Sequence, residues 1–280
     1  MACGSKLRRT RFAPSPTGPL HLGHALAAIT AHDRADPGQF LLRIEDLDRS
    51  RARPQWEAQI FDDLHWLGLD WPHPVLRQSE RMSFYQQAID KLENLSLTYR
   101  CSCSRADIRA ALEAPQEGSP LLGPDGLVYP GTCRGRQTGD TLRLDMARAL
   151  AHLRGRHLGF DDSGTRPGHH KLREEWLITH CGDVVLSRKD MGAAYHLAVV
   201  VDDAAQGITE VTRGEDLFEA TFIHVLLQAL LGLPTPAYHH HRLIRDEAGK
   251  RLAKRDDARA IATYRAEGAT PAEIRAKIGM

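Results

Sequence analysis

Short apolar runs and longer amphipathic stretches alternate along this chain of 280 residues. The apolar run over residues 40–44 predicts a buried strand. Trp56, Ile60 and Leu64 lie four residues apart and predict an amphipathic helix, which Gly68 ends. We predict further strands over residues 183–186 and 208–212, and further helices over residues 24–34, 79–95, 217–231 and 257–267. Because strands and helices alternate, we expect an α/β fold with a parallel sheet.

Three of the predicted helices carry additional signals. Gly232 and Pro234 end the helix over residues 217–231. Thr270 and Glu273 fit a capping box with Pro271 at the first helical position, so another helix begins there. The predicted buried positions are Phe84, Ala88, Ile89 and Leu92 in residues 79–95, and Phe218, Phe222, Val225, Leu226 and Ala229 in residues 217–231.

The composition and periodicity of the sequence change over residues 99–170. This stretch holds three of the five cysteines and a loop rich in proline and glycine at 115–126. This stretch has few long periodic segments and is predicted to be an insertion. We therefore divide the chain into residues 1–98 and 181–240 as two halves of one α/β domain, 99–180 as the insertion, and 241–280 as a C-terminal part.

Composition and charge narrow the class of protein. With 37 Lys and Arg against 36 Asp and Glu, the net charge is +1, which disfavours a protein that coats nucleic acid unspecifically. No window approaches the ~18 consecutive apolar residues of a membrane helix, and the N-terminus does not fit a signal peptide. We expect a cytoplasmic monomer that does not contact a membrane. Five cysteines, an odd number, favour free thiols or metal ligation over disulfides.

Two histidines flank a glycine where a helix is predicted to start. His21, Gly23 and His24 follow a turn-rich stretch over residues 13–19. A helix N-terminus binds anions, Gly23 allows close approach, and both imidazoles can donate to phosphate oxygens. The alternative is an ordinary turn with two surface histidines, because a motif this short is a weak signal.

A basic loop over residues 249–255 holds four cations, Lys250, Arg251, Lys254 and Arg255. Such a run fits a triphosphate or nucleic-acid phosphates, although a solvated loop has the same composition.

Together, and in this order, these two motifs resemble the HIGH and KMSKS signatures of class I aminoacyl-tRNA synthetases. More narrowly, four other segments resemble the catalytic core of glutamyl-tRNA synthetases. They are residues 11–18, residues 43–48, residues 195–198 with Asp202 and Asp203, and residues 212–216. The resemblance implies a Rossmann-type parallel sheet with an insertion and a short helical C-terminal part.

The C-terminal part differs from that family. Glutamyl-tRNA synthetases continue beyond the KMSKS loop with a helical domain that reads the anticodon, whereas 25 residues follow Arg255 here. A chain of this shape, with cysteines in its insertion, resembles the glutamyl-Q tRNA(Asp) synthetase family. That family activates glutamate without tRNA and esterifies it to the queuosine base at the wobble position of tRNA(Asp). We therefore expect no anticodon-binding domain, and L-glutamate, ATP and queuosine-containing tRNA(Asp) as substrates.

Three cysteines within 33 residues, Cys101, Cys103 and Cys133, indicate a metal site in the insertion. Chemistry alone leaves the fourth ligand open between Tyr129, His152 and His157. The resemblance implies one structural Zn²⁺, because the glutamyl-Q family has a Cys-x-Cys…Tyr-x3-Cys site that Cys101, Cys103, Tyr129 and Cys133 match. The loop over residues 114–127 is long and could loosen this site. Cys3 and Cys181 are predicted to be an exposed thiol and a core residue.

The resemblance also implies roles for single residues. Arg11 and Arg213 would hold carboxylates of glutamate, Glu45 its ammonium group, and Tyr195 would donate a hydroxyl. His21 and His24 would contact phosphates, Lys254 would neutralise charge that develops in the reaction, and Mg²⁺ would accompany ATP. The implied glutamate-binding residues are Arg11, Phe12, Ala13, Pro14, Ser15, Glu45, Tyr195 and Arg213. The implied ATP-binding residues are Pro14, His21, Gly23, His24, Arg251, Leu252, Ala253, Lys254 and Arg255.

Alternatives stay open at this point. Glu45 could instead belong to a salt-bridged loop with Arg43, and Ala253 replaces the serine of the KMSKS motif. The whole chain could be a shortened synthetase that charges a tRNA 3′ end, an inactive tRNA-binding paralogue, or a nucleotidyltransferase that shares only the histidine motif.

Overall fold

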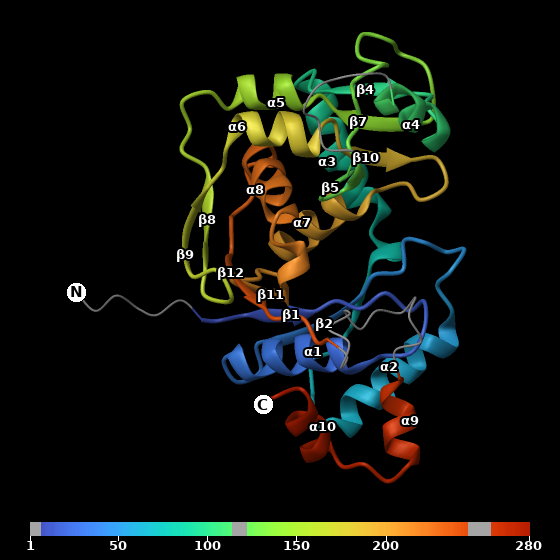
Figure 1. Cartoon of the computed structure of the whole chain (residues 1–280), viewed down its shortest axis with the longest axis vertical. Coiled ribbons are helices and arrows are strands. Elements are labelled where there is room, and N and C mark those ends of the chain that lie inside the picture. Colours follow the sequence, from blue (N-terminus) through green and yellow to red (C-terminus); the bar gives the residue numbers. More distant parts are fainter. Residues whose placement is uncertain (1–6, 114–121, 246–258) are drawn as a thin grey trace, which may run out of the picture.

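The computed structural model describes residues 7–113, 122–245 and 259–280 (Figure 1). Its helices are α1 (Leu22–Arg34), α2 (Pro54–Trp66), α3 (Met82–Asn94), α4 (Arg105–Glu113), α5 (Met146–His152), α6 (Glu174–Trp176), α7 (Tyr195–Ala205), α8 (Ala220–Leu231), α9 (Ile261–Ala266) and α10 (Pro271–Lys277), with the single turns η1 (Gln78–Glu80), η2 (Leu177–Cys181) and η3 (Glu215–Leu217). Its strands are β1 (Thr10–Phe12), β2 (Phe40–Ile44), β3 (Leu76–Arg77), β4 (Thr98–Cys101), β5 (Leu122–Gly123), β6 (Gly126–Leu127), β7 (Thr141–Leu144), β8 (Gly159–Asp162), β9 (Gly168–Lys171), β10 (Val185–Arg188), β11 (Glu210–Gly214) and β12 (Ala237–His241).

Parallel strands form the centre of the molecule, as the alternation of strands and helices predicted. β1 pairs with β2 and β2 with β3, and all three run in the same direction. β11, β12 and β8 form a second parallel ladder, with β9 antiparallel at its edge. The two ladders meet where the backbone amides of Thr209 and Glu210 donate to the carbonyl oxygen of Arg9 at 2.9 and 3.2 Å. The carboxyl ends of β1, β11 and β12 therefore lie at one edge.

Helices cover both faces of these strands (Figure 1). On one face, α1 and α2 enclose a core with the buried side chains of Leu26, Ile60 and Ile274. On the other face lie α7 and α8, whose core includes Leu197 and Leu226. None of the helices in the described ranges combines the length and apolarity needed to span a lipid bilayer.

The part of the insertion with β4, β7 and α4 lies at one end of the molecule, whereas β8 and β9 run alongside β12 (Figure 1). β4 and β10 both pair antiparallel with β7, so a strand that follows residue 180 completes a sheet of the insertion. Conversely, β8 pairs with β12 of the parallel ladder. Strands on the two sides of residue 180 therefore pair with each other.

Several predicted elements are confirmed. Residues 40–44 form β2, and α10 begins with the capping box of Thr270 and Glu273 and with Pro271 in its first turn. α9 lies within the helix predicted over residues 257–267, of which residues 257 and 258 fall outside the described ranges.

Two predicted helix faces are correct only in part, because Ile89 and Leu92 of α3 and Phe222, Val225 and Leu226 of α8 are buried as predicted, but other positions differ. In α3 the buried side chains are Tyr85, Ile89 and Leu92, whereas Phe84 is 47% exposed. Tyr85 is drawn inward because its hydroxyl donates to the buried carboxylate of Asp202 at 2.8 Å. In α8 the difference is that burial is not confined to the predicted face, since every residue except Ala229 is buried. The helix packs against α3, α7 and β8, and therefore has no solvent face.

Candidate active site

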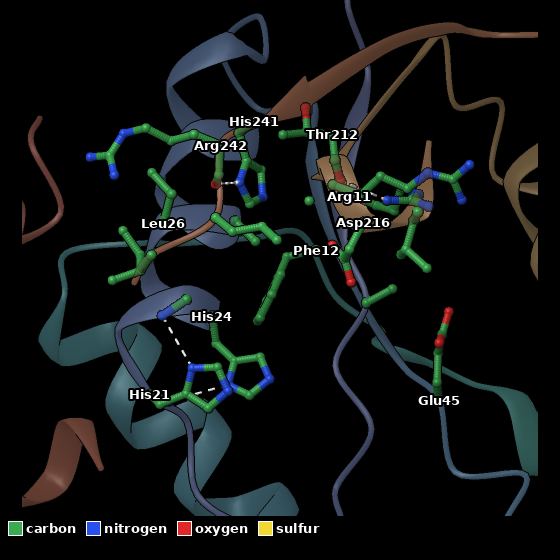
Figure 2. A pocket seen from close by; sticks show the side chains of 18 of the residues that line it. Arg11, Phe12, His21, His24, Leu26, Glu45, Thr212, Asp216, His241 and Arg242 are labelled. Carbon is green, nitrogen blue, oxygen red and sulfur yellow. Dashed lines mark hydrogen bonds between the residues drawn. The ribbon is translucent and has the colours of Figure 1, made fainter. Parts of the chain in front are cut away.

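A cavity of about 420 Å³ opens at the carboxyl ends of β1, β11 and β12 (Figure 2). Arg11 and Phe12 reach it from β1, Thr212 and Arg213 from β11, and His241 from β12. Because parallel strands end together at this edge, residues more than 200 positions apart line one space. The cavity lies where open α/β sheets commonly bind ligands.

His21 and His24 form the start of α1 and line one side of the cavity (Figure 2). Nδ1 of His21 accepts from the amide of Gly23, and Nδ1 of His24 accepts from the amide of His21, both at 3.1 Å. This is a capping box built from two histidines, whose ring centroids lie 3.8 Å apart. Since each Nδ1 is an acceptor, each neutral ring carries its proton on Nε2 as a donor. The predicted helix start at this motif is confirmed.

Gly23 fits closely beside the His21 ring. A Cβ atom at this position would lie 3.0 Å from Cε1 and 3.1 Å from Nδ1 of His21. A larger residue would therefore force the His21 ring to shift by a few tenths of an ångström.

Arg11 and Glu45 lie on the other side of the cavity from the two histidines (Figure 2). Asp203 accepts from Arg11 through both carboxylate oxygens, at 2.9 and 3.3 Å, and from Nη1 of Arg43 at 2.6 Å. Nη2 of Arg43 also donates to Glu45 at 3.2 Å. Desolvation opposes the charged form of Asp203, but Arg11 and Arg43 together hold its pKa below the usual range.

Glu45 belongs both to the ion pair and to the cavity. Its side chain is 11% exposed and lines the cavity while it accepts from Arg43. Burial raises the pKa of Glu45 although Arg43 and Arg11 oppose this shift. The two arginines therefore do not fully offset the cost of burying the Glu45 carboxylate, and a cation that enters the cavity would stabilise its charged form.

Arg213 is buried beneath the cavity wall and held by three side chains. Its Nη2 donates to Thr221 at 2.5 Å, Nη1 to Nδ1 of His224 at 3.1 Å, and Nε to Nε2 of His240 at 3.3 Å. A guanidinium group has five N–H donors, so two remain for a ligand. Burial and the adjacent Arg213 charge hold the pKa of His224 well below its ordinary value, and they lower the pKa of His240 to about 4.

A second cavity of about 500 Å³ adjoins the first. The two share lining residues, among them Phe12, His24, Glu45 and Tyr195. Beyond this common wall, the second cavity extends toward Gln78.

The structure brings together most of the predicted site. Arg11, Phe12, Ala13, His21, Gly23, His24, Glu45, Tyr195 and Arg213 line the first cavity, and Pro14 and Ser15 line the second. The predicted residues Arg251, Leu252, Ala253, Lys254 and Arg255 lie outside the described residues.

A second cluster of functional side chains lies in the insertion. The sulfur atoms of Cys101, Cys103 and Cys133 all lie within 4.8 Å of one another. The hydroxyl of Tyr129 lies 3.3 Å from the sulfur of Cys101 and 3.4 Å from that of Cys103, which is 3.4 Å from the sulfur of Cys133. The edges of a tetrahedron around zinc, with Zn–S distances of about 2.3 Å, are about 3.8 Å long. The four side chains thus fit a closed tetrahedral metal site.

Without metal, the pKa values of two groups in this cluster shift in opposite directions. Burial opposes a thiolate at Cys133, but hydrogen bonds from Tyr129, from the Ser102 backbone and from the other two thiols lower its pKa to about 6. Burial and the same thiols raise the pKa of Tyr129. A bound divalent cation would reverse this preference for the neutral phenol.

Two predicted details of the cysteines can be compared with the structure. His152 and His157 are exposed, and neither belongs to the cluster found among the described residues. Cys181 is a core residue, as predicted, and burial raises the pKa of its thiol. Cys3 and residues 114–121 of the long loop lie outside the described residues.

Comparison with known proteins decides the family. The model of the catalytic domain of class I tRNA synthetases (E and Q) matches residues 8–121 and 170–279. The chain belongs to this family. It is an enzyme of the aminoacyl-tRNA synthetase type, and the inactive-paralogue and nucleotidyltransferase alternatives lose their support.

Two curated relatives of this synthetase carry the same name. A glutamyl-Q tRNA(Asp) synthetase of Rhodobacter capsulatus is 62% identical over 277 residues, which cover 97% of this chain and 99% of the relative. Another, from Nocardia farcinica, is 42% identical and covers 94% of this chain and 81% of its own length.

Solved structures agree with the class I synthetase fold. A glutamate tRNA ligase of Elizabethkingia meningosepticum, solved in complex with its amino acid, superimposes with a TM-score of 0.74 at 28% identity. A glutamate-tRNA synthetase of Elizabethkingia anophelis gives 0.75 at 28% identity. Each match covers 98% of this chain and 61% of the solved chain, so this chain spans about three fifths of their length.

Sequence reasoning missed the buried partners of this synthetase's arginines. Thr221, His224 and Gln228 are polar residues at helical spacing within the otherwise apolar α8, and the first two contact Arg213. That polar stripe on a very apolar helix was the available signal. His240 gave another, as the middle residue of three consecutive histidines that form the end of β12.

Proposed function

We propose that this enzyme activates L-glutamate with ATP, without tRNA, and transfers the glutamyl group to the queuosine base at the wobble position of tRNA(Asp). The observation that carries the choice of amino acid is the charge of the first cavity. The names of the relatives support the choice of acceptor.

Glutamate carries two carboxylates and one ammonium group, so its net charge at neutral pH is −1. The charged side chains that line the cavity, within the described residues, are Arg11, Arg213, Arg242, Glu45 and Asp216. Two further charged side chains form ion pairs with this lining, Asp203 with Arg11 and Arg43 with Glu45. Four guanidinium groups against three carboxylates leave one net positive charge, the complement of bound glutamate. Glutamine has no net charge and would leave this charge uncompensated.

A different side chain would then bind each charged group of glutamate. Arg213 has two remaining N–H donors in a fixed fork, which suits a carboxylate better than the point charge of a lysine. Arg11, anchored by Asp203, would hold the other carboxylate. Glu45 faces the same space with an under-compensated charge and would accept the ammonium group.

Activation requires an in-line attack. An oxygen of the α-carboxylate forms a bond to the α-phosphorus of ATP, and the bond to the bridging oxygen breaks as pyrophosphate leaves with the electron pair. His21 and His24 carry Nε2–H donors at the positive end of α1 and would contact the phosphates. Lys254 would neutralise charge in the transition state, and Mg²⁺ would accompany ATP.

The second cavity provides space for the acceptor. It shares the wall of Glu45 and Tyr195 with the first cavity, so a nucleoside there would lie beside the adenylate. A hydroxyl of the queuosine cyclopentenediol would attack the glutamyl carbonyl carbon, and AMP would leave.

In the insertion we propose one structural zinc ion held by Cys101, Cys103, Tyr129 and Cys133. The three sulfurs lie within 4.8 Å of one another, and three separations of 3.3–3.4 Å among the sulfurs and the Tyr129 oxygen support this ligand set. Four protein ligands would leave no open position, which fits a structural site. Because ATP and tRNA are its proposed substrates, we expect the enzyme in the cytoplasm.

The acceptor is tested with labelled glutamate and an anticodon-arm RNA of tRNA(Asp) that carries queuosine but has no tRNA 3′ end. We expect label to attach to this RNA in the presence of ATP. The matched control is the same RNA with guanine at the wobble position, which should stay unlabelled.

Full-length unmodified tRNA separates the competing activity, the charging of a 3′ end. Labelling of that tRNA, without labelling of the queuosine arm, would show an ordinary glutamyl-tRNA synthetase and overturn the proposed acceptor. Independently, glutamate-dependent exchange between ATP and pyrophosphate should occur with no RNA present.

A further inference from the structure

A line of buried side chains leads from Arg213 to the insertion. Nη1 of Arg213 lies 3.1 Å from Nδ1 of His224, Nε2 of His224 lies 2.9 Å from Nδ1 of His196, and Nε2 of His196 lies 3.1 Å from a carboxylate oxygen of Asp125. Arg213, His196 and His224 are 6%, 4% and 2% exposed. Asp125 lies in the turn between β5 and β6, whereas the other three belong to β11, α7 and α8.

The two ends of this line fix the direction of every hydrogen bond. Arg213 can only donate, so Nδ1 of His224 accepts and its proton is on Nε2. That proton is donated to Nδ1 of His196, whose own Nε2 proton goes to the carboxylate of Asp125, which can only accept. Both rings are therefore neutral and have the same tautomer. A second proton on either ring would place two donors against each other.

The line restricts where Arg213 can lie. Thr221 and His240 hold Nη2 and Nε, while His224 holds Nη1, so all three nitrogens of the guanidinium group are anchored. Of these anchors, His224 leads to Asp125 in the β5–β6 turn, whereas His240 leads to Asp162 of β8. His224 itself stays in place because His196 and Asp125 fix its ring.

Resting on the proposed binding of a glutamate carboxylate by Arg213, we propose that Asp125, His196 and His224 are positioning residues for Arg213. Through them the β5–β6 turn of the insertion tunes the affinity for glutamate. The insertion thus has a role in binding the amino acid, in addition to its fold around the cysteine cluster.

The test compares steady-state ATP–pyrophosphate exchange by Asp125→Ala and Asp125→Asn variants of the full chain. Asp125 has a side chain that is 37% exposed, so both variants should fold. Asp125→Ala should raise the KM for glutamate about 3- to 10-fold, with kcat and the KM for ATP within twofold of wild type. Asp125→Asn keeps an oxygen that accepts from His196 and should restore most of the affinity.

Asp161→Ala is the matched control. Asp161 accepts from His169 at 2.8 Å on the β8–β9 hairpin, so it forms the same kind of pair, but at an exposed position on the face of β8 opposite the buried Asp162. It should leave the KM for glutamate unchanged. A second variant, His224→Asn, keeps an acceptor for Arg213 but cannot reach His196, and should resemble Asp125→Ala.

The outcomes separate this inference from the proposed function. If Arg213→Ala raises the KM for glutamate while Asp125→Ala and His224→Asn do not, the line has no positioning role and the proposed function stands. If Arg213→Ala leaves that KM unchanged, the assignment of Arg213 to glutamate is itself wrong. Nitrogen-15 NMR should find both histidines as neutral Nε2–H tautomers at pH 7.5, and a proton on Nδ1 of either ring would overturn the direction of the line.

Discussion

Asp203 holds Arg11 through both of its carboxylate oxygens, at 2.9 and 3.3 Å, in a site where both side chains are almost completely buried. The same carboxylate accepts from the fully buried Arg43 at 2.6 Å. One carboxylate thus positions two guanidinium groups beside the cavity and compensates the charge of Arg11, which lines it.

The Asp203→Asn variant should therefore lose both stability and glutamate affinity. It leaves two buried cations without their shared counter-ion, and breaking a buried ion pair costs about 3–5 kcal/mol. Urea unfolding measures the stability, and ATP–pyrophosphate exchange measures the KM for glutamate. Asp202→Asn is the control, because Asp202 accepts from Gln78, Arg81 and Tyr85 instead. It should destabilise the fold and raise the KM for glutamate much less; equal KM values in the two variants would contradict the role of Asp203.

Arg213→Lys should raise the KM for glutamate about 10- to 150-fold, the factor that corresponds to about 1.5–3 kcal/mol for a charge-assisted hydrogen bond. Lysine keeps the charge but loses the fork that donates to Thr221, His224 and a carboxylate together. The KM for ATP should stay near its wild-type value. The measurement is exchange kinetics with each substrate varied separately, and an unchanged glutamate KM would remove Arg213 from the pocket.

Local signals in the sequence were sufficient to predict an element where the interacting residues lie close together in the sequence. The capping box of Thr270 and Glu273 and the helix start at His21 could be predicted because each is made within a few residues. The inward face of α3 could not, since what buries Tyr85 in place of Phe84 is Asp202, 117 residues away.

In the candidate site, too, some features could be predicted from the sequence and others could not. The sequence named Arg43 as a partner of Glu45, but it did not reveal what holds Arg11 and Arg213. Asp203 contacts Arg11, which is distant in sequence, and His224 contacts Arg213, which lies on another element. The sequence shows a charged residue on one helix and a histidine within an apolar helix, but it does not show which residue each of them contacts. Such networks follow from tertiary packing rather than from local pattern.

The purified enzyme should contain about one zinc ion per chain, and Cys103→Ser should lose it. Removing one thiolate from a closed site of four ligands weakens binding, and the insertion should become less stable as a result. Elemental analysis and thermal unfolding measure the two effects. His152→Ala should keep the metal, since His152 is exposed and outside the cluster. Metal-free wild-type protein, prepared without chelators, would rule out this site.

The stability of the fold should decrease as the pH falls below about 6.5, and His240 should account for part of that decrease. Burial and the charge of Arg213 lower its pKa from 6.5 to about 4, although Asp162 accepts from its Nδ1 and opposes the shift. Between these two values the unfolded chain binds a proton at His240 that the folded chain does not. The contribution of His240 is therefore complete above pH 6.5 and is lost as the pH falls toward 4, at about 1.4 kcal/mol per pH unit.

Other groups add to this dependence or oppose it. Burial also lowers the pKa of His224, His239 and His241, which act in the same direction as His240. Burial raises the pKa of Asp63 to about 6 and raises that of Glu45, and these carboxyl groups act in the opposite direction. A substitution at His240 isolates its own share from this background.

His240→Asn provides that measurement. Asparagine has no titration in this range, and its side-chain amide can still donate to Asp162. We expect the variant to be less stable than wild type at pH 7.5, and the difference to shrink as the pH is lowered to 5. Urea unfolding at several pH values measures both free energies. A difference that stays constant from pH 7.5 to 5 would show that His240 takes up its proton equally in the folded and unfolded chain, and that its burial beside Arg213 does not suppress its protonation.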